Sequence, residues 1–355
     1  MSTATRFNDE IVVQDYYRAD GHSRVDYDWG SFDGFFASGR ANGWGVQSIR
    51  RKTFPGGLPS DEVALYRGDW KNGKRDGYGR LEIPWEFKVY EGGWSQGKAF
   101  GFGKVITMKK GWAGEWEESG WKDGVRHGWG VKCITSDPKE TMWQTGGYKD
   151  GEQHGYTVTS TDKTERYSSL KNGVPHGYQT IKRDGVLQSR EFYLDGRLAA
   201  QPMGSFPSTW FPTLVAFSPL GARYNGPTHT VNGSVTLFDG DTYSGNLSYG
   251  TAHGYGVLVR SNTHLRSGTY DGGWKHGYAC GYGVWMGNDG FVYAGGWLNG
   301  KPFGYGKVTI GSAVFDTFWE DGQGWKFEVT LNLAPPEPMF FRVPTPQPLP
   351  QAWAI

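Results

Sequence analysis

The chain has little of what marks secreted, membrane-spanning or nucleic-acid-binding proteins. Cysteine is rare, with 2 residues among 355, so we expect no disulfide framework and a reducing, intracellular compartment. The 37 basic and 36 acidic residues nearly cancel, so no overall field attracts nucleic acid or an anionic membrane. No stretch approaches the roughly 18 apolar residues of a membrane span, and the chain opens without an apolar signal segment. We therefore expect a cytoplasmic protein that does not bind nucleic acid.

Glycine and aromatic residues, by contrast, are abundant, with 56 Gly, 17 Trp, 20 Tyr and 20 Phe. They recur in one frame, Tyr-x-Gly-x-Trp-x-x-Gly-x-x-x-Gly-x-Gly, whose nearly perfect copies begin at Tyr66, Tyr90, Tyr270 and Tyr293. Self-similarity at a period of about 20–50 residues indicates a repeat array. Weaker copies keep part of the frame over 32–45, 121–130, 148–155, 170–177, 193–196, 243–256 and 315–322. Function is therefore expected on a long surface rather than in a pocket.

One repeat has the pattern of a β-hairpin. From Tyr66 to Trp70 large or small residues alternate with charged ones, which is typical of a half-buried strand. Asn72-Gly73 supplies the positive φ angles of a tight turn, and residues 77–83 form the returning strand. A single hairpin is marginally stable, so the hairpins must stack, with each Gly-x-Gly serving as a flat floor for a neighbouring ring. We predict one continuous, twisted antiparallel sheet, rod-like or gently curved, with little helix.

The predicted fold class is all-β, an elongated antiparallel sheet or solenoid of stacked hairpins. The predicted organisation has a non-repeat segment (1–28), a first array (29–198), a proline-rich connector or degenerate repeat (199–230), a second array (231–332) and a proline-rich tail (333–355). The connector and the tail are set apart by proline, which is excluded from central strands.

The frame resembles the MORN repeat (membrane occupation and recognition nexus), and the match runs from about residue 32 to residue 322. The resemblance implies stacked hairpins that bind other proteins. Relatives include radial-spoke-head components of cilia, cytoskeletal scaffolds, and bridges between membranes and other structures. No block resembles the SET or kinase domains joined to these repeats in other proteins.

Aromatic residues of the frame are the predicted packing residues, and they are also candidates for partner contact. They are Tyr66, Trp70, Tyr90, Trp94, Trp112, Trp116, Trp121, Tyr148, Tyr243, Tyr270, Trp274, Tyr293 and Trp297. Packing between repeats is the favoured role, because large rings must supply a core that is poor in aliphatic residues.

Two motifs suggest ligands and are interpreted otherwise. A Gly-x4-Gly-Lys run ends at Lys74, Lys98 and Lys301, yet each copy lacks the final Ser or Thr of a phosphate-binding loop and lies in a hairpin. Histidines precede the glycine of four returning strands, at His127, His154, His176 and His253. Zinc needs three or four ligands converging within about 2.0–2.3 Å, whereas stacked repeats space these residues singly. We interpret them as hydrogen-bonding residues beside the turns and expect no cofactor and no metal.

No arrangement of nucleophile, base and acid stands out, so we expect a protein that is not an enzyme. The favoured function is a structural scaffold within a ciliary, radial-spoke-like assembly of the axoneme or within the cytoskeleton. Its partners would be other proteins of that assembly, and a homodimer is left open. The alternative is a phosphoinositide or membrane-contact module. That alternative needs a cluster of about four to eight basic residues, and the basic groups here are short and scattered.

The tail carries Pro335, Pro336, Pro338, Pro344, Pro346, Pro348 and Pro350. This density favours an extended polyproline II helix, whose usual receptors are aromatic grooves. We predict that the tail anchors a partner or lies along its own array, with Phe340, Phe341 and Trp353 as anchoring side chains. A loose terminus is the alternative.

Overall fold

The computed structural model describes residues 20–27, 30–51, 62–109, 112–137, 140–199, 205–206, 231–237, 240–261, 267–320 and 323–331. The first nineteen residues, most of the 199–230 connector and the tail from residue 332 lie outside the described residues, and so do the predicted anchors Phe340, Phe341 and Trp353. The described chain consists of strands and one 3-10 turn, η1 (Pro84–Glu86). The all-β prediction is confirmed.

The first sheet has 15 strands that follow chain order, each antiparallel to the next. They are β1 (Gly21–Tyr27), β2 (Gly30–Ala37), β3 (Arg40–Arg50), β4 (Val63–Lys71), β5 (Lys74–Ile83), β6 (Lys88–Ser95), β7 (Lys98–Lys109), β8 (Trp112–Lys122), β9 (Val125–Asp137), β10 (Glu140–Lys149), β11 (Glu152–Ser160), β12 (Thr164–Lys171), β13 (Val174–Arg183), β14 (Val186–Leu194) and β15 (Arg197–Leu198). Strand β1 lies within the 1–28 segment, where no repeat was recognised.

The second sheet has 10 strands. They are β16 (Ser205–Phe206), β17 (Val231–Thr236), β18 (Thr242–Ser248), β19 (Thr251–Arg260), β20 (Gly268–Lys275), β21 (Tyr278–Gly287), β22 (Phe291–Leu298), β23 (Lys301–Ile310), β24 (Ala313–Glu320) and β25 (Gln323–Leu331). Strands β17 to β25 follow chain order, and β16 pairs with β25 at one edge.

The turns have the predicted chemistry. Asn72 and Gly73 have φ values of 53° and 81°, the positive pair that a two-residue hairpin turn requires. The amide of Gly73 also donates a 2.8 Å hydrogen bond to the carbonyl of Ala41 in the preceding hairpin. In the same way, the amide of Gly97 donates a 2.9 Å hydrogen bond to the carbonyl of Arg75. Each turn therefore ties its hairpin to the one before it.

A ladder of aromatic rings forms the core of each sheet. The ring of Tyr66 lies edge-on to that of Trp94 in the next repeat, with centroids 5.3 Å apart. The Tyr66 hydroxyl donates to the carbonyl of Asp69 at 3.1 Å, and Trp94 Nε1 donates to the carbonyl of Gly79 at 3.2 Å. The second sheet repeats both bonds, for example from Trp297 Nε1 to Gly283 at 3.1 Å. Because the buried polar atoms of Tyr66, Trp94 and Trp297 are paired, these rings carry little desolvation penalty.

The glycine floor was predicted for both glycines of Gly-x-Gly, and this prediction is wrong for the first of them. A Cβ on Gly79 would lie 2.3 Å from the Tyr66 hydroxyl, so the second glycine is indeed the floor. The first glycine has a positive φ, 88° at Gly128, and in the repeats that contact the other sheet it packs against that sheet, whereas a Cβ on Gly77 would meet Asp69 of its own sheet.

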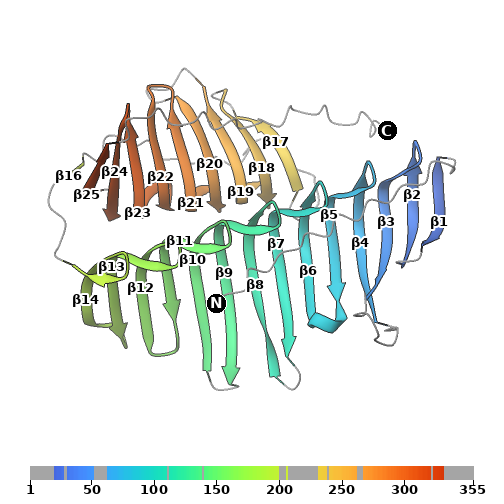
Figure 1. Ribbon diagram of the computed structural model, residues 1–355, viewed down its shortest axis with the longest axis horizontal. Coiled ribbons are helices and arrows are strands. Elements are labelled where there is room, and N and C mark those ends of the chain that lie inside the picture. Colours follow the sequence, from blue (N-terminus) through green and yellow to red (C-terminus); the bar gives the residue numbers. More distant parts are fainter. Residues whose placement is uncertain are drawn as a thin grey trace.

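The prediction of one continuous sheet is also wrong, because the repeats form two sheets that meet along the turn-side ends of their strands (Figure 1). The ladder of the first sheet ends at the two-residue strand β15, and the next described strand, β16, pairs with β25 instead. The second sheet then runs alongside the first in the same direction, with β19 against β7, β21 against β9 and β23 against β12. Stacking buries two aromatic faces that a single extended sheet would leave exposed.

Candidate functional site

Residues that flank the first glycine of Gly-x-Gly join the two sheets. Three tyrosines of the second sheet, Tyr255, Tyr282 and Tyr305, insert between successive rings of the first. Tyr282 lies 5.5 Å from His127 and 5.0 Å from His154, measured between ring centroids. Tyr305 lies 5.5 Å from His154 and 4.6 Å from His176. The two sheets are therefore interlocked by a regular row of rings.

A lysine of the first sheet lies over the ring of each of these three tyrosines. The Nζ atoms of Lys122, Lys149 and Lys171 lie 4.9, 5.2 and 5.3 Å from the ring centroids of Tyr255, Tyr282 and Tyr305. Lys122 also forms a 3.4 Å ion pair with Asp271, and Asp271 accepts a hydrogen bond from the Tyr255 hydroxyl. Asp316 likewise forms a 3.7 Å ion pair with Lys171 and accepts a 2.9 Å hydrogen bond from the Tyr305 hydroxyl. Charge and ring contacts thus reinforce each other across the interface.

Three of the four histidines have the hydrogen-bonding role that the sequence predicted, whereas the buried Nδ1 of His253 has no hydrogen-bond partner among the described residues. His154 Nδ1 accepts the amide of Asn172 at 3.2 Å, and His176 Nδ1 accepts the amide of Asp195 at 3.2 Å. Both amides belong to the turn of the next hairpin. Burial lowers the pKa of His154 to about 4, and it lowers the pKa of His253 to about 4. Both rings therefore remain neutral at physiological pH.

Close approach of the sheets depends on the residue before the frame tryptophan, or before the Tyr148 or Leu170 that takes its place. It is glycine at Gly120, Gly147, Gly273 and Gly296, where a Cβ would collide with backbone. At the far end of the stack this position holds Ser169 on β12 and Phe318 on β24. Larger side chains there keep the backbones apart, and a groove opens between the sheets.

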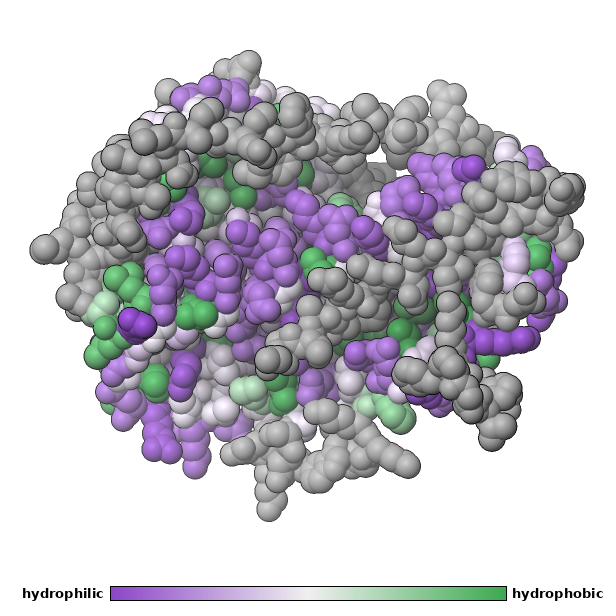
Figure 2. Space-filling model, in the orientation of Figure 1, coloured by the Kyte–Doolittle hydropathy of each residue, from purple (hydrophilic) through white to green (hydrophobic). Residues whose placement is uncertain are grey.

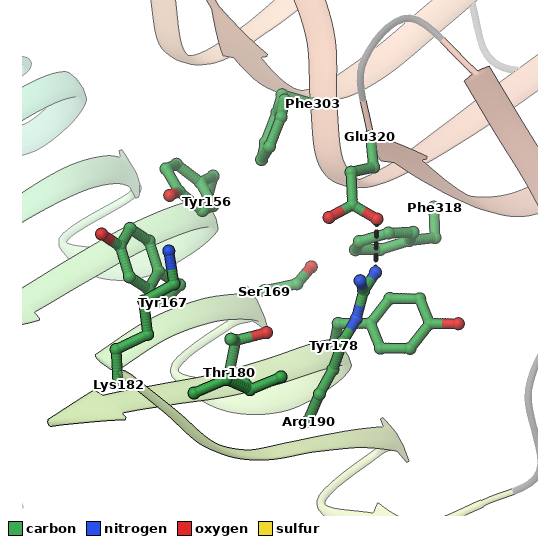
Figure 3. A pocket seen from close by; sticks show the side chains of 11 residues that line it. Tyr156, Tyr167, Ser169, Tyr178, Thr180, Lys182, Arg190, Phe303, Phe318 and Glu320 are labelled. Carbon is green, nitrogen blue, oxygen red and sulfur yellow. Dashed lines mark hydrogen bonds and ion pairs between the residues drawn. The ribbon is translucent and has the colours of Figure 1, made fainter. Parts of the chain in front are cut away.

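We call this opening the aromatic groove (Figure 3). It encloses about 330 Å³ and is lined by Tyr156, Tyr167, Ser169, Tyr178, Thr180, Lys182, Leu187, Arg190, Phe303, Phe318 and Glu320. Cations already lie over two of its rings, with Lys182 Nζ 5.2 Å from the Tyr167 centroid and Arg190 Cζ 4.2 Å from that of Tyr178. Arg190 also pairs with Glu320 across the groove.

A second surface lies beyond the stack, on strands β2 to β5. The second sheet reaches the first at β5, and β1 to β4 extend past it (Figure 1). On these strands the positions that elsewhere contact the other sheet carry Phe35, Trp44 and Tyr78, which are 48 %, 52 % and 36 % exposed. We call this surface the open face. Around it Arg80 pairs with Glu82 at 3.0 Å and with Glu91 at 3.1 Å, so its charges balance.

A second hollow, of about 530 Å³, is polar and is lined mainly by β7 to β11. Its charges neutralise one another, in a 3.0 Å pair of Lys132 with Glu115 and a 3.5 Å pair of Arg126 with Glu117. Elsewhere, hydrophilic residues dominate the described surface in the view of Figure 2, with apolar residues in small separate groups.

Comparison with known families matches six segments of the chain to the MORN repeat: 66–85, 90–106, 118–133, 243–264, 270–292 and 293–311. The protein is a MORN-repeat protein. Three of the matched repeats belong to each sheet. No curated protein sequence matches the chain. MORN repeats are known as protein- and membrane-interaction repeats.

Most of the predicted MORN site residues lie in the ring ladder rather than on the surface. Those that are buried are Tyr66, Trp70, Tyr90, Trp94, Trp121, Tyr148, Tyr243, Tyr270, Trp274, Tyr293 and Trp297. Trp116 is half-buried and contacts Trp143, with centroids 5.5 Å apart. Trp112 contributes backbone to β8, and its side chain lies outside the described part. The buried rings pack the MORN repeats and are closed to a partner.

The Gly-x4-Gly-Lys runs and the histidines, which resembled ligand-binding motifs, lie in hairpins of the two sheets. Lys74, Lys98 and Lys301 are the first residues of β5, β7 and β23, where no helix N-terminus is present to hold a phosphate. Among the described residues, no group of three or more His, Cys, Asp or Glu side chains is placed to hold a metal ion. No helix in the same part of the chain has the length and apolar character of a membrane span.

Sequence reasoning missed the exposed aromatic residues of the open face and the groove, although a signal for them exists. The residue before the frame tryptophan is glycine in the tightly stacked repeats, whereas Asp69 holds this place on β4, beyond the stack. Asp69 Oδ2 accepts the amide of Tyr78 at 3.0 Å, which occupies the surface where another backbone would otherwise lie. Asp69 in the place of glycine is therefore a sequence signal for the open face on β4.

Proposed function

We propose that this MORN-repeat protein is a non-catalytic scaffold that binds a partner protein on the open face. The observation that carries the proposal is the exposure of Phe35, Trp44 and Tyr78 at positions that form the sheet-to-sheet interface further along. Aromatic side chains gathered on one surface mark interaction sites. The second sheet is an internal example of an occupant, so the expected partner presents a sheet face rich in aromatic residues and glycine.

We place the assembly in the cytoplasm, within a cilium or the cytoskeleton. Resemblance to radial-spoke-head and cytoskeletal members of the MORN family supports this setting. Immunolocalisation in a ciliated cell tests it, and a diffuse signal independent of axoneme and cytoskeletal filaments would contradict it.

Charge on the open face favours a protein over a membrane. Arg80 is neutralised by Glu82 and Glu91, and Arg67 also pairs with Glu82 at 3.0 Å. Membrane attachment through electrostatics contributes only about 1 kcal/mol per unpaired basic residue near the surface. Pelleting with phosphoinositide vesicles at physiological salt should therefore leave the protein in the supernatant.

The chain offers a matched pair of triple variants for the test. Replacing Phe35, Trp44 and Tyr78 by Ser removes the open face, whereas replacing Phe87, Trp143 and Tyr249 by Ser removes three other exposed rings of the same types. Affinity purification should lose its most abundant partners with the first variant only, at unchanged thermal stability. Equal partner recovery from both variants would contradict the proposal. A partner lost with the first variant that proves to be a second copy would assign the open face to a homodimer instead.

A further inference from the structure

The aromatic groove is built for a neutral, apolar ligand. Lys182 and Arg190 already lie over the faces of Tyr167 and Tyr178, and Arg190 is held by Glu320. A cationic ligand would have to displace these built-in cations. Tyr156 and Phe303 are partly exposed, so their rings can pack against apolar rings that carry no charge.

The groove also contains a hydrogen-bond donor that has no acceptor within the described part of the chain. Ser169 is 2 % exposed, and its Oγ makes no hydrogen bond there. In Figure 3 it lies between Tyr167 and Lys182 on one side and Arg190 and Glu320 on the other. A buried hydroxyl without a partner costs about 1–3 kcal/mol, so a ligand that brings a carbonyl acceptor to Ser169 is favoured.

Proline-rich peptide in the polyproline II conformation has both properties. Its pyrrolidine rings are neutral and apolar, its carbonyl groups are all unpaired, and proline itself has no N–H to satisfy. Polyproline II helices dock in grooves lined by aromatic residues and lose little conformational entropy on binding. Ring packing and the Ser169 hydroxyl therefore point to the same class of ligand.

We propose that the aromatic groove binds the proline-rich C-terminal segment of the same chain, residues 335–350. This segment holds seven prolines, in Pro335-Pro336-Glu337-Pro338 and at every second position from Pro344 to Pro350. The proposal is independent of the open face, which lies on other strands.

The chain leaves the described structure on the strand next to one wall of the groove, within reach of the tail. Leu331 is the last residue of β25, which pairs along β24, the strand that carries Phe318 and Glu320. Leu331 lies opposite Ala313, and Glu320 is seven residues further along β24, or about 24 Å at the rise of a strand. The stretch from residue 331 to residue 344 spans about 40 Å as polyproline II. Because the segment is tethered, its effective concentration at the groove is of millimolar order, which suffices for a weak peptide ligand.

Photo-cross-linking in the full chain tests the proposal. Benzoylphenylalanine is introduced at Leu187, which lines the groove, and in a second protein at the adjacent Val186, which does not; both positions are exposed. After irradiation of the purified monomer, peptides from residues 335–350 should be joined to position 187 within single chains, and at least fivefold less to position 186. Equal yields at the two positions, absence of tail peptides, or links formed only between two chains would overturn the proposal.

Three further variants keep the result specific. Tyr167→Ala removes one wall of the groove, and Tyr193→Ala removes a tyrosine with the same hydroxyl contact to a glutamate two residues earlier but outside the groove. The cross-link from position 187 should fall several-fold with the first change and persist with the second. Substitution of Pro344, Pro346 and Pro348 by Ala should also reduce it, at unchanged thermal unfolding. A cross-link yield insensitive to both Tyr167 and the prolines would show that the tail does not occupy the groove.

Discussion

Gly128 and Gly273 face each other across the two sheets at a distance that admits no side chain. A Cβ placed on Gly128 would lie 2.8 Å from the Cα of Gly273, and one on Gly273 would lie 2.7 Å from the amide nitrogen of Trp129. The pair recurs one step along the stack, where a Cβ on Gly155 would lie 2.8 Å from the Cα of Gly296. Contact between bare backbones thus defines the spacing of the two arrays.

Gly273→Ala should therefore separate the sheets locally. Overpacking costs about 1–3 kcal/mol, and here both the opposing backbone and the Cys280 carbonyl, 2.2 Å from the added Cβ, must give way. Chemical denaturation measures the change in the free energy of unfolding. Gly290→Ala is the control, because Gly290 has a positive φ but nothing within 4 Å of its added Cβ. A smaller loss at Gly273 than at Gly290 would contradict the close stacking.

Trp274→Ala should cost about 3–5 kcal/mol, the usual range for truncating a large buried aromatic residue. Trp274 is buried, contacts Tyr243 and Tyr270, and donates a 3.0 Å hydrogen bond from Nε1 to the carbonyl of Gly256. Trp44→Ala on the open face should change the unfolding free energy by less than about 1 kcal/mol, since that ring is half exposed. Thermal or urea unfolding compares the two. Similar losses from both variants would contradict the assignment of buried and open faces.

Acid should weaken the stack through its histidines. The pKa of His154 is lowered to about 4 by burial, whereas the unfolded chain titrates near pH 6.5, so the unfolded state binds more protons between these values. The stability due to neutral His154 is complete above pH 6.5 and is lost as the pH falls toward 4. The loss reaches about 2 kcal/mol by pH 5. His253, whose pKa is also about 4, adds a loss of the same sign.

His154→Phe isolates this effect, because Phe100 occupies the same repeat position and contacts Tyr255 with centroids 5.6 Å apart. The variant should lose less stability between pH 7.5 and pH 5 than the natural chain does. Urea unfolding at each pH measures both stability profiles. Identical profiles for the two proteins would show that His154 does not cause the loss of stability in acid.

Local structure was largely predictable from the sequence, because each hairpin is specified by its own residues. Asn72-Gly73 requires a tight turn, and alternation from Tyr66 to Trp70 requires a strand, whatever the rest of the chain does. Burial of Trp94 and Trp274 follows from the same frame.

The stacking of the arrays was not predictable in this way. It depends on contacts between residues that lie far apart in the chain, such as Gly128 with Gly273 and His154 with Tyr305. Repeat periodicity describes neighbours within a sheet and carries no information on which sheet face meets which. The groove is a consequence of stacking, because Ser169 and Phe318 come together only when the two sheets do.

Small-angle X-ray scattering of the full chain tests the stacked arrangement most directly. A single ladder of 25 strands spaced about 4.8 Å apart would be about 120 Å long, and a rod of that length has a radius of gyration of about 35 Å. A compact chain of 355 residues has a radius of gyration of about 20 Å. Two sheets that lie together predict a value much nearer the compact limit than the rod. A value near 35 Å would contradict the account, because the aromatic groove exists only if the two MORN arrays lie together.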